Sequence, residues 1–194
     1  MAWTAVFGAP FTRTPATFRK ADMKTLYFIG GPMGVGKTAA CKILKTMLDK
    51  CVFLDGDWCW DMHPFQLTEE TKAVAIENAA FILNNFLHCS AYENVVFCWV
   101  MQYQSTIDAL LSRLDLNGCA VKNVSLVCDA SSLKARLQKD LDSGVRGCKD
   151  IFEKSFARLP LYYGLNTAKL DTSGMSSVQV AQALLDMPTS SPQK

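Results

Sequence analysis

Residues 31–38, GPMGVGKT, constrain the fold of this chain more than any other segment. They match the phosphate-loop pattern G-x-x-x-x-G-K-[ST] at every position. Residues 25–29, TLYFI, precede the loop with the β-branched, aromatic and aliphatic side chains of a buried strand. Residues 39–48 follow it with apolar side chains at helical spacing. The sequence therefore predicts a strand, a glycine turn and the start of a helix, which together offer backbone N–H groups and a positive helix end to an anion.

This arrangement predicts that the chain binds a nucleoside triphosphate, taken as ATP, together with Mg²⁺. The glycines allow the backbone to wrap closely around a phosphate, and the Lys37 ammonium can reach the β- and γ-phosphates. The Thr38 hydroxyl is the expected metal ligand from this segment. The residues expected to contact the nucleotide are Gly31, Met33, Gly34, Val35, Gly36, Lys37, Thr38 and Ala39.

The composition is that of an ordinary globular protein of about one domain, with 194 residues, 49% of them hydrophobic and 20% charged. A formal charge of +2 is too small to favour a nucleic-acid groove or a membrane patch. Eight cysteines occur without any C-x-x-C pair, and no secretory signal is apparent. We therefore expect reduced thiols and a cytoplasmic protein.

We expect three parts along the chain. Residues 1–22 form an N-terminal extension, basic and rich in hydroxyl side chains, that is either a transit-like leader or a poorly ordered segment. Residues 23–187 form the folded domain, and residues 188–194 are polar and form a flexible tail.

Strand and helix patterns alternate through the domain. Strands are predicted at residues 25–29, 51–54, 94–101, 121–128 and 168–171, and helices at 39–48, 68–88, 105–114, 131–141, 150–165 and 178–187. We expect a bend near Pro160 and an apolar face on the last helix at Val178, Ala181 and Leu185. This order predicts an α/β fold with a five-stranded parallel sheet and helices on both faces. Ligands of such a sheet bind beyond the carboxyl ends of its strands.

Two carboxylates, Asp55 and Asp57, follow the second predicted strand. One could hold Mg²⁺ and the other could take a proton from an attacking hydroxyl, although Asp-Gly-Asp can also form a simple polar turn. The third predicted strand ends in Gln102 and Tyr103 without an acid. Because motor-type and switch-type NTPases place a metal-binding acid there, Asp55 is the expected metal ligand here, and a small-molecule kinase is favoured over an ATPase engine.

A basic segment at residues 134–149 has two interpretations. It is either a mobile lid that neutralises charge on a transferred phosphoryl group or a solvated amphipathic helix. Under the lid interpretation, Arg136 and Arg146 are the expected catalytic arginines, because arginine makes bidentate phosphate contacts. Arg158 is a weaker candidate that could simply pair with a nearby acid.

Trp58, Trp60 and His63 follow the carboxylates and could form an aromatic acceptor pocket or pack into the core. Trp58 is favoured for the pocket because it adjoins Asp57. Gln102, at the end of the third predicted strand, is placed to contact an acceptor hydroxyl.

The phosphate loop, the strand end LDGD at 54–57, the helix start L-x-x-R at 133–136 and the segment KLDTS at 169–173 resemble the P-loop nucleotide and small-molecule kinases. That group includes adenylate, shikimate, gluconate and adenylylsulfate kinases, chloramphenicol phosphotransferase, and bacterial proteins described only as ATP-binding or kinase-like. The resemblance covers residues 24–187, but only the phosphate loop is highly specific. It implies a three-layer P-loop NTPase fold of the nucleoside-kinase type, with ATP–Mg²⁺ as phosphoryl donor.

For individual residues, the resemblance implies that Asp57 is the base on the acceptor side, that Asp55 lies near the metal and that Arg136 lies near the nucleotide. The run at 57–64, DWCWDMHP, matches no well-known substrate signature, so the acceptor stays open.

The leading functional hypothesis is an ATP-dependent phosphotransferase that moves the γ-phosphoryl group to a hydroxyl of a small molecule or nucleotide. Its expected catalytic residues are Lys37, Asp57, Arg136 and Arg146, with Thr38 and Asp55 at the metal. The alternative is a nucleotide-binding regulatory ATPase module without a small-molecule acceptor. A polynucleotide kinase is disfavoured by the near-neutral charge. No membrane or nucleic-acid partner is expected, and the protein is expected to be a monomer or a homodimer.

Overall fold

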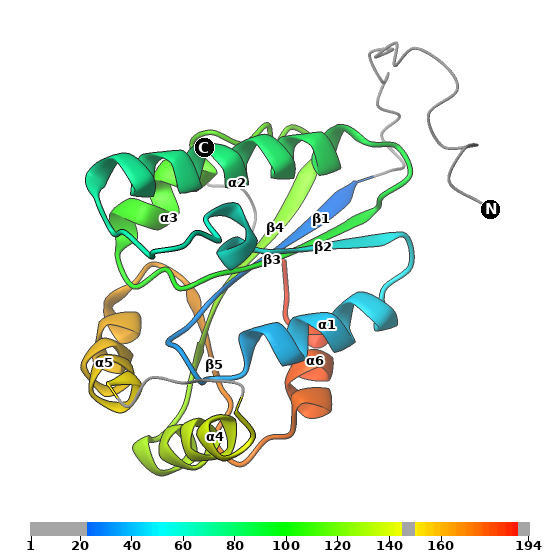
Figure 1. The fold of residues 1–194 in the computed structure, drawn as a ribbon. Coiled ribbons are helices and arrows are strands. Elements are labelled where there is room, and N and C mark those ends of the chain that lie inside the picture. The colour runs from blue at the N-terminus through cyan, green and yellow to red at the C-terminus, as the bar shows by residue number, and fades with distance from the viewer. Residues whose placement is uncertain (1–22, 145–149, 190–194) are drawn as a thin grey trace, which may run out of the picture.

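The computed structural model describes residues 23–144 and 150–189, which form a five-stranded parallel sheet with helices on both faces (Figure 1). The strands are β1 (Lys24–Gly30), β2 (Cys51–Asp55), β3 (Asn94–Cys98), β4 (Cys119–Val127) and β5 (Ala168–Asp171), in the order β2-β3-β1-β4-β5. The helices are α1 (Lys37–Met47), α2 (Glu69–His88), α3 (Gln104–Leu111), α4 (Ala130–Asp142), α5 (Ile151–Arg158) and α6 (Ser177–Asp186). The predicted fold class is confirmed.

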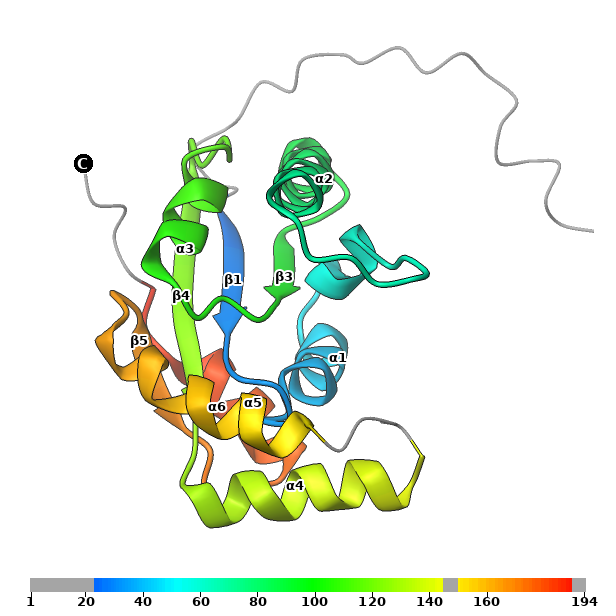
Figure 2. The same ribbon diagram turned by 60° about the vertical axis from the view of Figure 1, so that its left-hand side comes forward.

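Two short 3-10 helices, η1 (Gly56–Cys59) and η2 (Leu159–Gly164), complete the fold. Helices α2 and α3 cover one face of the sheet, and α1 and α6 cover the other (Figure 1). Helices α4 and α5 lie beyond the carboxyl end of β1, on the side where the phosphate loop begins (Figure 2). The residues predicted as an extension, 1–22, and residues 190–194 of the predicted tail lie outside the described part of the chain.

Strand β1 is the centre of the sheet, hydrogen-bonded to β3 on one side and β4 on the other. Because both faces are covered by helices, its side chains can be apolar without alternation. Leu26, Phe28 and Ile29 are fully buried in this strand. The central strand is therefore rigidly packed, and it delivers the phosphate loop to the carboxyl edge of the sheet.

The structure corrects two details of the expected elements. The third strand ends at Cys98 rather than Met101: the Trp99 amide still donates to the Ile29 carbonyl at 3.1 Å, and the chain then leaves the sheet. The predicted apolar face of the last helix is wrong at Val178, which is 58% exposed. Instead, the buried face is formed by Val180, Ala181 and Leu184, which lie within one turn of each other.

The bend expected near Pro160 stays a prediction: α5 ends at Arg158 and gives way to the 3-10 helix η2 at Leu159. Leu159 keeps right-handed helical dihedrals, and Pro160 stands in the first turn of η2, where its missing N–H costs no helical hydrogen bond. Among the described residues, none of the helices combines the length and the apolar character that a membrane crossing requires.

Helix α2 provides a test of the packing. We expect Leu83→Ala, at a fully buried position, to lower the free energy of unfolding by about 2–5 kcal/mol. The matched change Phe81→Ala, at a position that is 70% exposed, should stay within about 0.5 kcal/mol of the parent. Urea unfolding of both variants measures the difference, and equal losses would contradict the observed orientation of the helix.

Candidate active site

The phosphate loop, residues 31–38, connects β1 to the start of α1 and leaves an open anion-sized cradle. Gly36 caps α1 with φ of 99°, a left-handed conformation that favours glycine. Among the described residues, no heavy atom lies within 4 Å of the position that a Cβ would take there. The first turn of α1 contains no acidic side chain. The positive end of α1 therefore faces space that a phosphate can fill.

Gly34 is required for a different reason, because the loop packs tightly against helix α4. A Cβ at this position would lie 2.3 Å from Leu137 Cδ2, and φ is 81°. The glycine thus permits the close contact between the phosphate loop and α4 that fixes the shape of the loop.

Lys37 lies along the inner side of the loop and is 9% exposed. Its Nζ donates to the Gly31 carbonyl at 2.8 Å and to the Pro32 carbonyl at 2.9 Å. The ammonium group is therefore held at the phosphate-binding cradle by the loop itself.

Thr38 and Asp55 connect the phosphate loop to the end of β2 through a hydrogen bond. The Thr38 hydroxyl donates to Asp55 Oδ2 at 2.7 Å. Asp55 is 6% exposed, and its Oδ1 accepts from the Asp57 amide at 3.1 Å. Among the described residues, no group of three or more His, Cys, Asp or Glu side chains could hold a metal. A hydroxyl beside one carboxylate instead suits Mg²⁺, which is commonly held by one or two carboxylates together with substrate phosphates and water.

Asp57 is held in place by a residue that the sequence analysis missed. Trp99 Nε1 donates to Asp57 Oδ1 at 3.1 Å, and Trp99 is only 5% exposed. A Cβ on Gly56 would lie 2.3 Å from Trp99 Cγ, so this glycine gives the indole ring its space. The available signal was a Trp directly after a strand that ends at the same edge of the sheet as β2.

A single cleft of about 1080 Å³ brings these side chains together. Its walls include Met33, Lys37, Thr38, Asp55 and Asp57 from the predicted site, and Gln102 lines it as expected. The remaining lining residues are Trp60, Asp61, Met62, Phe65, Leu67, Glu69, Lys72, Ala73, Ile76, Glu77, Trp99, Val100, Tyr103, Ser105, Thr106, Arg113, Lys154 and Arg158.

The preference for Trp58 over Trp60 as a pocket residue is wrong. Trp58 does not line the cleft and packs edge-on against Phe53, whereas Trp60 is part of the cleft wall. The reason is that Trp60 directly follows η1 and the backbone leaves the 3-10 conformation there, with φ of −149° and ψ of 31°. The Trp60 ring packs against Trp99, with centroids 5.3 Å apart, and so lies near Asp57, to which Trp99 donates. His63 is exposed and does not line the cleft.

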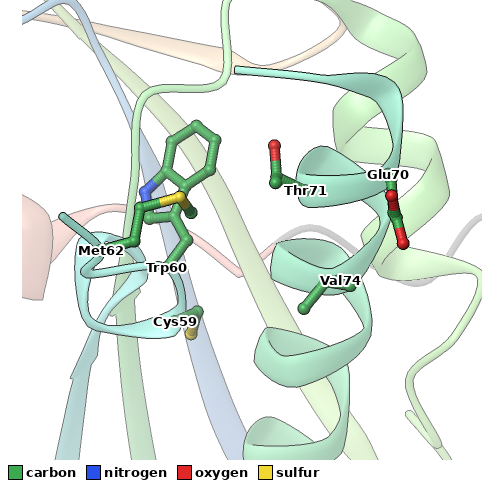
Figure 3. Close-up of a pocket in the computed structure, with 6 residues that line it drawn as sticks. All are labelled: Cys59, Trp60, Met62, Glu70, Thr71 and Val74. Carbon is green, nitrogen blue, oxygen red and sulfur yellow. The ribbon is translucent and has the colours of Figure 1, made fainter. Parts of the chain in front are cut away.

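A smaller pocket of about 170 Å³ lies between η1 and the first turns of α2 (Figure 3). Trp60 and Met62 line both this pocket and the larger cleft (Figure 3). Cys59 also lines the small pocket, and burial raises the pKa of its thiol to about 11. The thiol is consequently protonated at neutral pH and is not an activated nucleophile.

Arg136 forms four hydrogen bonds with the phosphate loop and with the segment that follows β5. Arg136 Nη1 donates to the Val35 carbonyl and to Thr172 Oγ1, both at 2.9 Å. Its Nη2 donates to the Thr172 and Met175 carbonyls at 2.5 and 3.2 Å. Arg136 therefore joins the phosphate loop to the segment between β5 and α6, and its closure over a transferring group stays a prediction. Arg146 lies outside the described residues.

Arg158, the weaker sequence candidate, lines the cleft together with Lys154. Arg158 Nη1 lies 3.8 Å from the Met33 sulfur, so its guanidinium adjoins the phosphate loop. Lys154, and not Arg158, pairs with Asp150, at 3.8 Å. The basic residues in the sequence alone could not reveal that Arg158 reaches the phosphate loop, because the path of the chain through α5 decides which of them do so.

Residues 28–155 match the model of a family described as an AAA domain. Among curated proteins, no relative matches the chain. The fold is similar to that of the tunicamycin resistance protein of Deinococcus radiodurans, with a TM-score of 0.61 and 18% identity over 87% of this chain and 99% of that one. A gluconokinase from Sinorhizobium meliloti gives a TM-score of 0.59 at 18% identity, covering 84% and 92% of the two chains. Shikimate kinase from Acinetobacter baumannii gives 0.52 at 19%, covering 84% and 91%.

Arg136→Lys tests the link between the phosphate loop and the β5–α6 segment. A lysine cannot reproduce the four bonds of the guanidinium, so we expect a loss of about 1–3 kcal/mol in the free energy of unfolding, together with weaker ATP binding. Denaturant unfolding and calorimetric titration measure the two effects. Lys134→Ala, on an exposed position of the same helix, is the control and should change neither.

Proposed function

Because the chain belongs to the AAA domain family and has the fold of the P-loop kinases, we propose that it is an ATP-dependent phosphotransferase that moves the γ-phosphoryl group to a hydroxyl of a small molecule or nucleotide. One observation carries this proposal. The Thr38–Asp55 pair, 2.7 Å apart, stands beside Asp57 on the wall of a cleft of about 1080 Å³, which is large enough to hold a nucleotide and an acceptor. The kinase names of the neighbouring structures agree with this reaction class.

The phosphate loop would hold the triphosphate. Its backbone N–H groups at the start of α1 provide hydrogen bonds, and the Lys37 ammonium can turn from the Gly31 and Pro32 carbonyls to phosphate oxygens. Thr38 and Asp55 would hold Mg²⁺. Bound ATP–Mg²⁺ supplies the phosphoryl group and neutralises part of its charge.

Asp57 would act as the general base toward the acceptor. Trp99 fixes the Oδ1 atom of this carboxylate, which leaves Oδ2 to accept the hydroxyl proton. The acceptor oxygen then forms a bond to the γ-phosphorus as the bond from phosphorus to the bridging oxygen breaks, with ADP as leaving group. Phosphoryl transfer depends chiefly on such positioning and on electrostatic stabilisation.

Arg158 and Lys154 would stabilise the charge on the transferring group, because they line the cleft near the loop. Arg136 would support the loop from behind, and the predicted contribution of Arg146 as a lid residue stays a proposal.

The extent of the cleft beyond the phosphate loop supports a kinase over a regulatory ATPase module, which needs no acceptor space. The free thiols of the seven described cysteines suit a cytoplasmic protein.

Lys37→Ala should lower phosphoryl transfer by at least about 100-fold, since the ammonium that contacts the transferring phosphates is lost. The fold should be retained, as measured by circular dichroism. A coupled assay for ADP, run with and without an acceptor panel, gives the rate. A variant with undiminished turnover would exclude the assigned role of Lys37.

Asp57→Asn should lower acceptor-dependent turnover by about 10²–10⁴-fold while ATP binding is kept, because the amide cannot accept the hydroxyl proton. Asp49→Asn is the control, since Asp49 is exposed at the opposite end of β2. Both variants are compared by turnover and by calorimetric titration with ATP–Mg²⁺. Unchanged turnover in Asp57→Asn would show that another group removes the proton.

A further inference from the structure

We propose that the acceptor of this site is a hydroxyl compound with a flat, apolar ring system and no anionic group. The inference rests on the proposed function only for the transfer step, because the recognition surface is described independently of catalysis. Two sets of side chains carry it: an aromatic corner, defined as Trp60, Phe65 and Trp99, and an acidic rim, defined as Asp61, Glu69 and Glu77.

The aromatic corner is preorganised. The Trp60 ring meets the Trp99 ring edge-on, with centroids 5.3 Å apart and an interplanar angle of 83°. It meets the Phe65 ring in the same manner, at 5.4 Å and 79°. Trp99 is fixed in turn by its hydrogen bond to Asp57. Rigid aromatic side chains offer a large contact area at little cost in conformational entropy, so this corner suits a flat ring.

The cleft wall also carries strongly exposed apolar side chains, one of them in the corner itself. Phe65 is 61% exposed, Leu67 is 55% exposed and Tyr103 is 56% exposed, although all three line the cleft. Apolar side chains gathered around a concave surface mark a ligand site more often than a random surface feature. Because Trp99 belongs to the corner and also binds Asp57, a ring seated here places its substituents next to the proposed base.

The charges on this wall oppose an anion. Among the described residues that line the cleft outside the phosphate loop, β2 and α5, the acids are Asp57 and the three members of the acidic rim. The cations there are Lys72 and Arg113. Lys72 is paired with Glu69 at 2.7 Å. Arg113 Nη1 donates to the neutral Ala109 carbonyl at 2.6 Å and keeps its charge, but the four acids outnumber the two cations on this wall. Neither Asp61 nor Glu77 forms an ion pair within the described part of the chain.

The other basic residues that line the cleft, Lys37, Lys154 and Arg158, lie elsewhere. Lys37 belongs to the phosphate loop, and Arg158 adjoins Met33 of the same loop. These cations are therefore committed to the phosphates of the donor. A carboxylate or phosphate on the acceptor would instead meet Asp61 and Glu77, whose repulsion lowers its affinity.

The test uses one ring system with three substituents: 6-(hydroxymethyl)naphthalene carrying a carboxamide, an aminomethyl or a carboxylate group at position 2. The hydroxyl and the ring are constant, so the charge is the variable. Calorimetric titration of the full chain measures binding, and an ADP-coupled assay with ATP–Mg²⁺ measures transfer. We expect the carboxamide and the amine to bind at least about tenfold more tightly than the carboxylate.

Two sets of variants assign the effect. Trp60→Ala should weaken binding of all three compounds by roughly tenfold or more, and Trp60→Phe should restore part of it. Trp58→Ala is the matched control, since Trp58 is 60% exposed and outside the cleft. The double variant Asp61→Asn with Glu77→Gln should bring the affinities for amide and carboxylate within about threefold of each other. Melting temperatures show which variants keep the fold.

The outcomes separate this inference from the proposed function. If the three compounds bind in the expected order but none of them is phosphorylated, the inference about recognition stands and the kinase assignment is contradicted. If the compound that carries the carboxylate is phosphorylated in preference to the other two, with turnover that depends on Lys37, the kinase assignment stands and the inference is overturned. Binding of none of the three compounds, or a Trp60→Ala variant that binds like the parent, would overturn it as well.

Discussion

The contact between Thr38 and Asp55 is the constraint on which the rest of the site depends. It joins the first turn of α1 to the end of β2, although β3 lies between β2 and the central strand β1 in the sheet. The phosphate loop can therefore meet a carboxylate only because β2 ends at the level where α1 begins. Asp55 is buried, so its charge needs partners, and the Thr38 hydroxyl and the Asp57 amide supply them. The same bonds set the direction in which the next turn, η1, leaves the strand.

The end of β3 is adapted to this arrangement. Asp55 pairs with Cys98 in the register of the two strands, and the Cys98 sulfur lies 3.6 Å from Asp55 Oδ2. A second acid at this position would place two negative charges side by side in a buried environment, which is costly. A thiol avoids that cost and donates a weak hydrogen bond. The absence of an acid at Cys98 on β3 and the presence of Asp55 on β2 are thus linked, and this arrangement is consistent with the proposal that Asp55 alone supplies the carboxylate for Mg²⁺.

Most of the fold and half of the site follow from local patterns. The phosphate loop, the Thr38–Asp55 pair and the five parallel strands could be predicted because their signals lie in short segments with fixed spacing. The role of Trp99 could not be predicted in this way, because it depends on a contact with Asp57, which lies 42 positions away and follows a different strand. Likewise, the choice between Trp58 and Trp60 depends on how the backbone leaves η1 at Trp60, which no hydrophobic period reveals. Arg158 reaches the loop only through the path of α5 and η2, and charge counting does not describe that path.

The shared position of Trp60 has a consequence for how the molecule could be altered. The Trp60 indole and the Met62 side chain line both the cleft of about 1080 Å³ and the adjoining pocket of about 170 Å³. Two side chains, rather than the backbone, therefore border both spaces. Smaller side chains at these positions would enlarge the cleft toward Val74 on α2, and compounds with a longer tail could then be accommodated without any movement of the sheet.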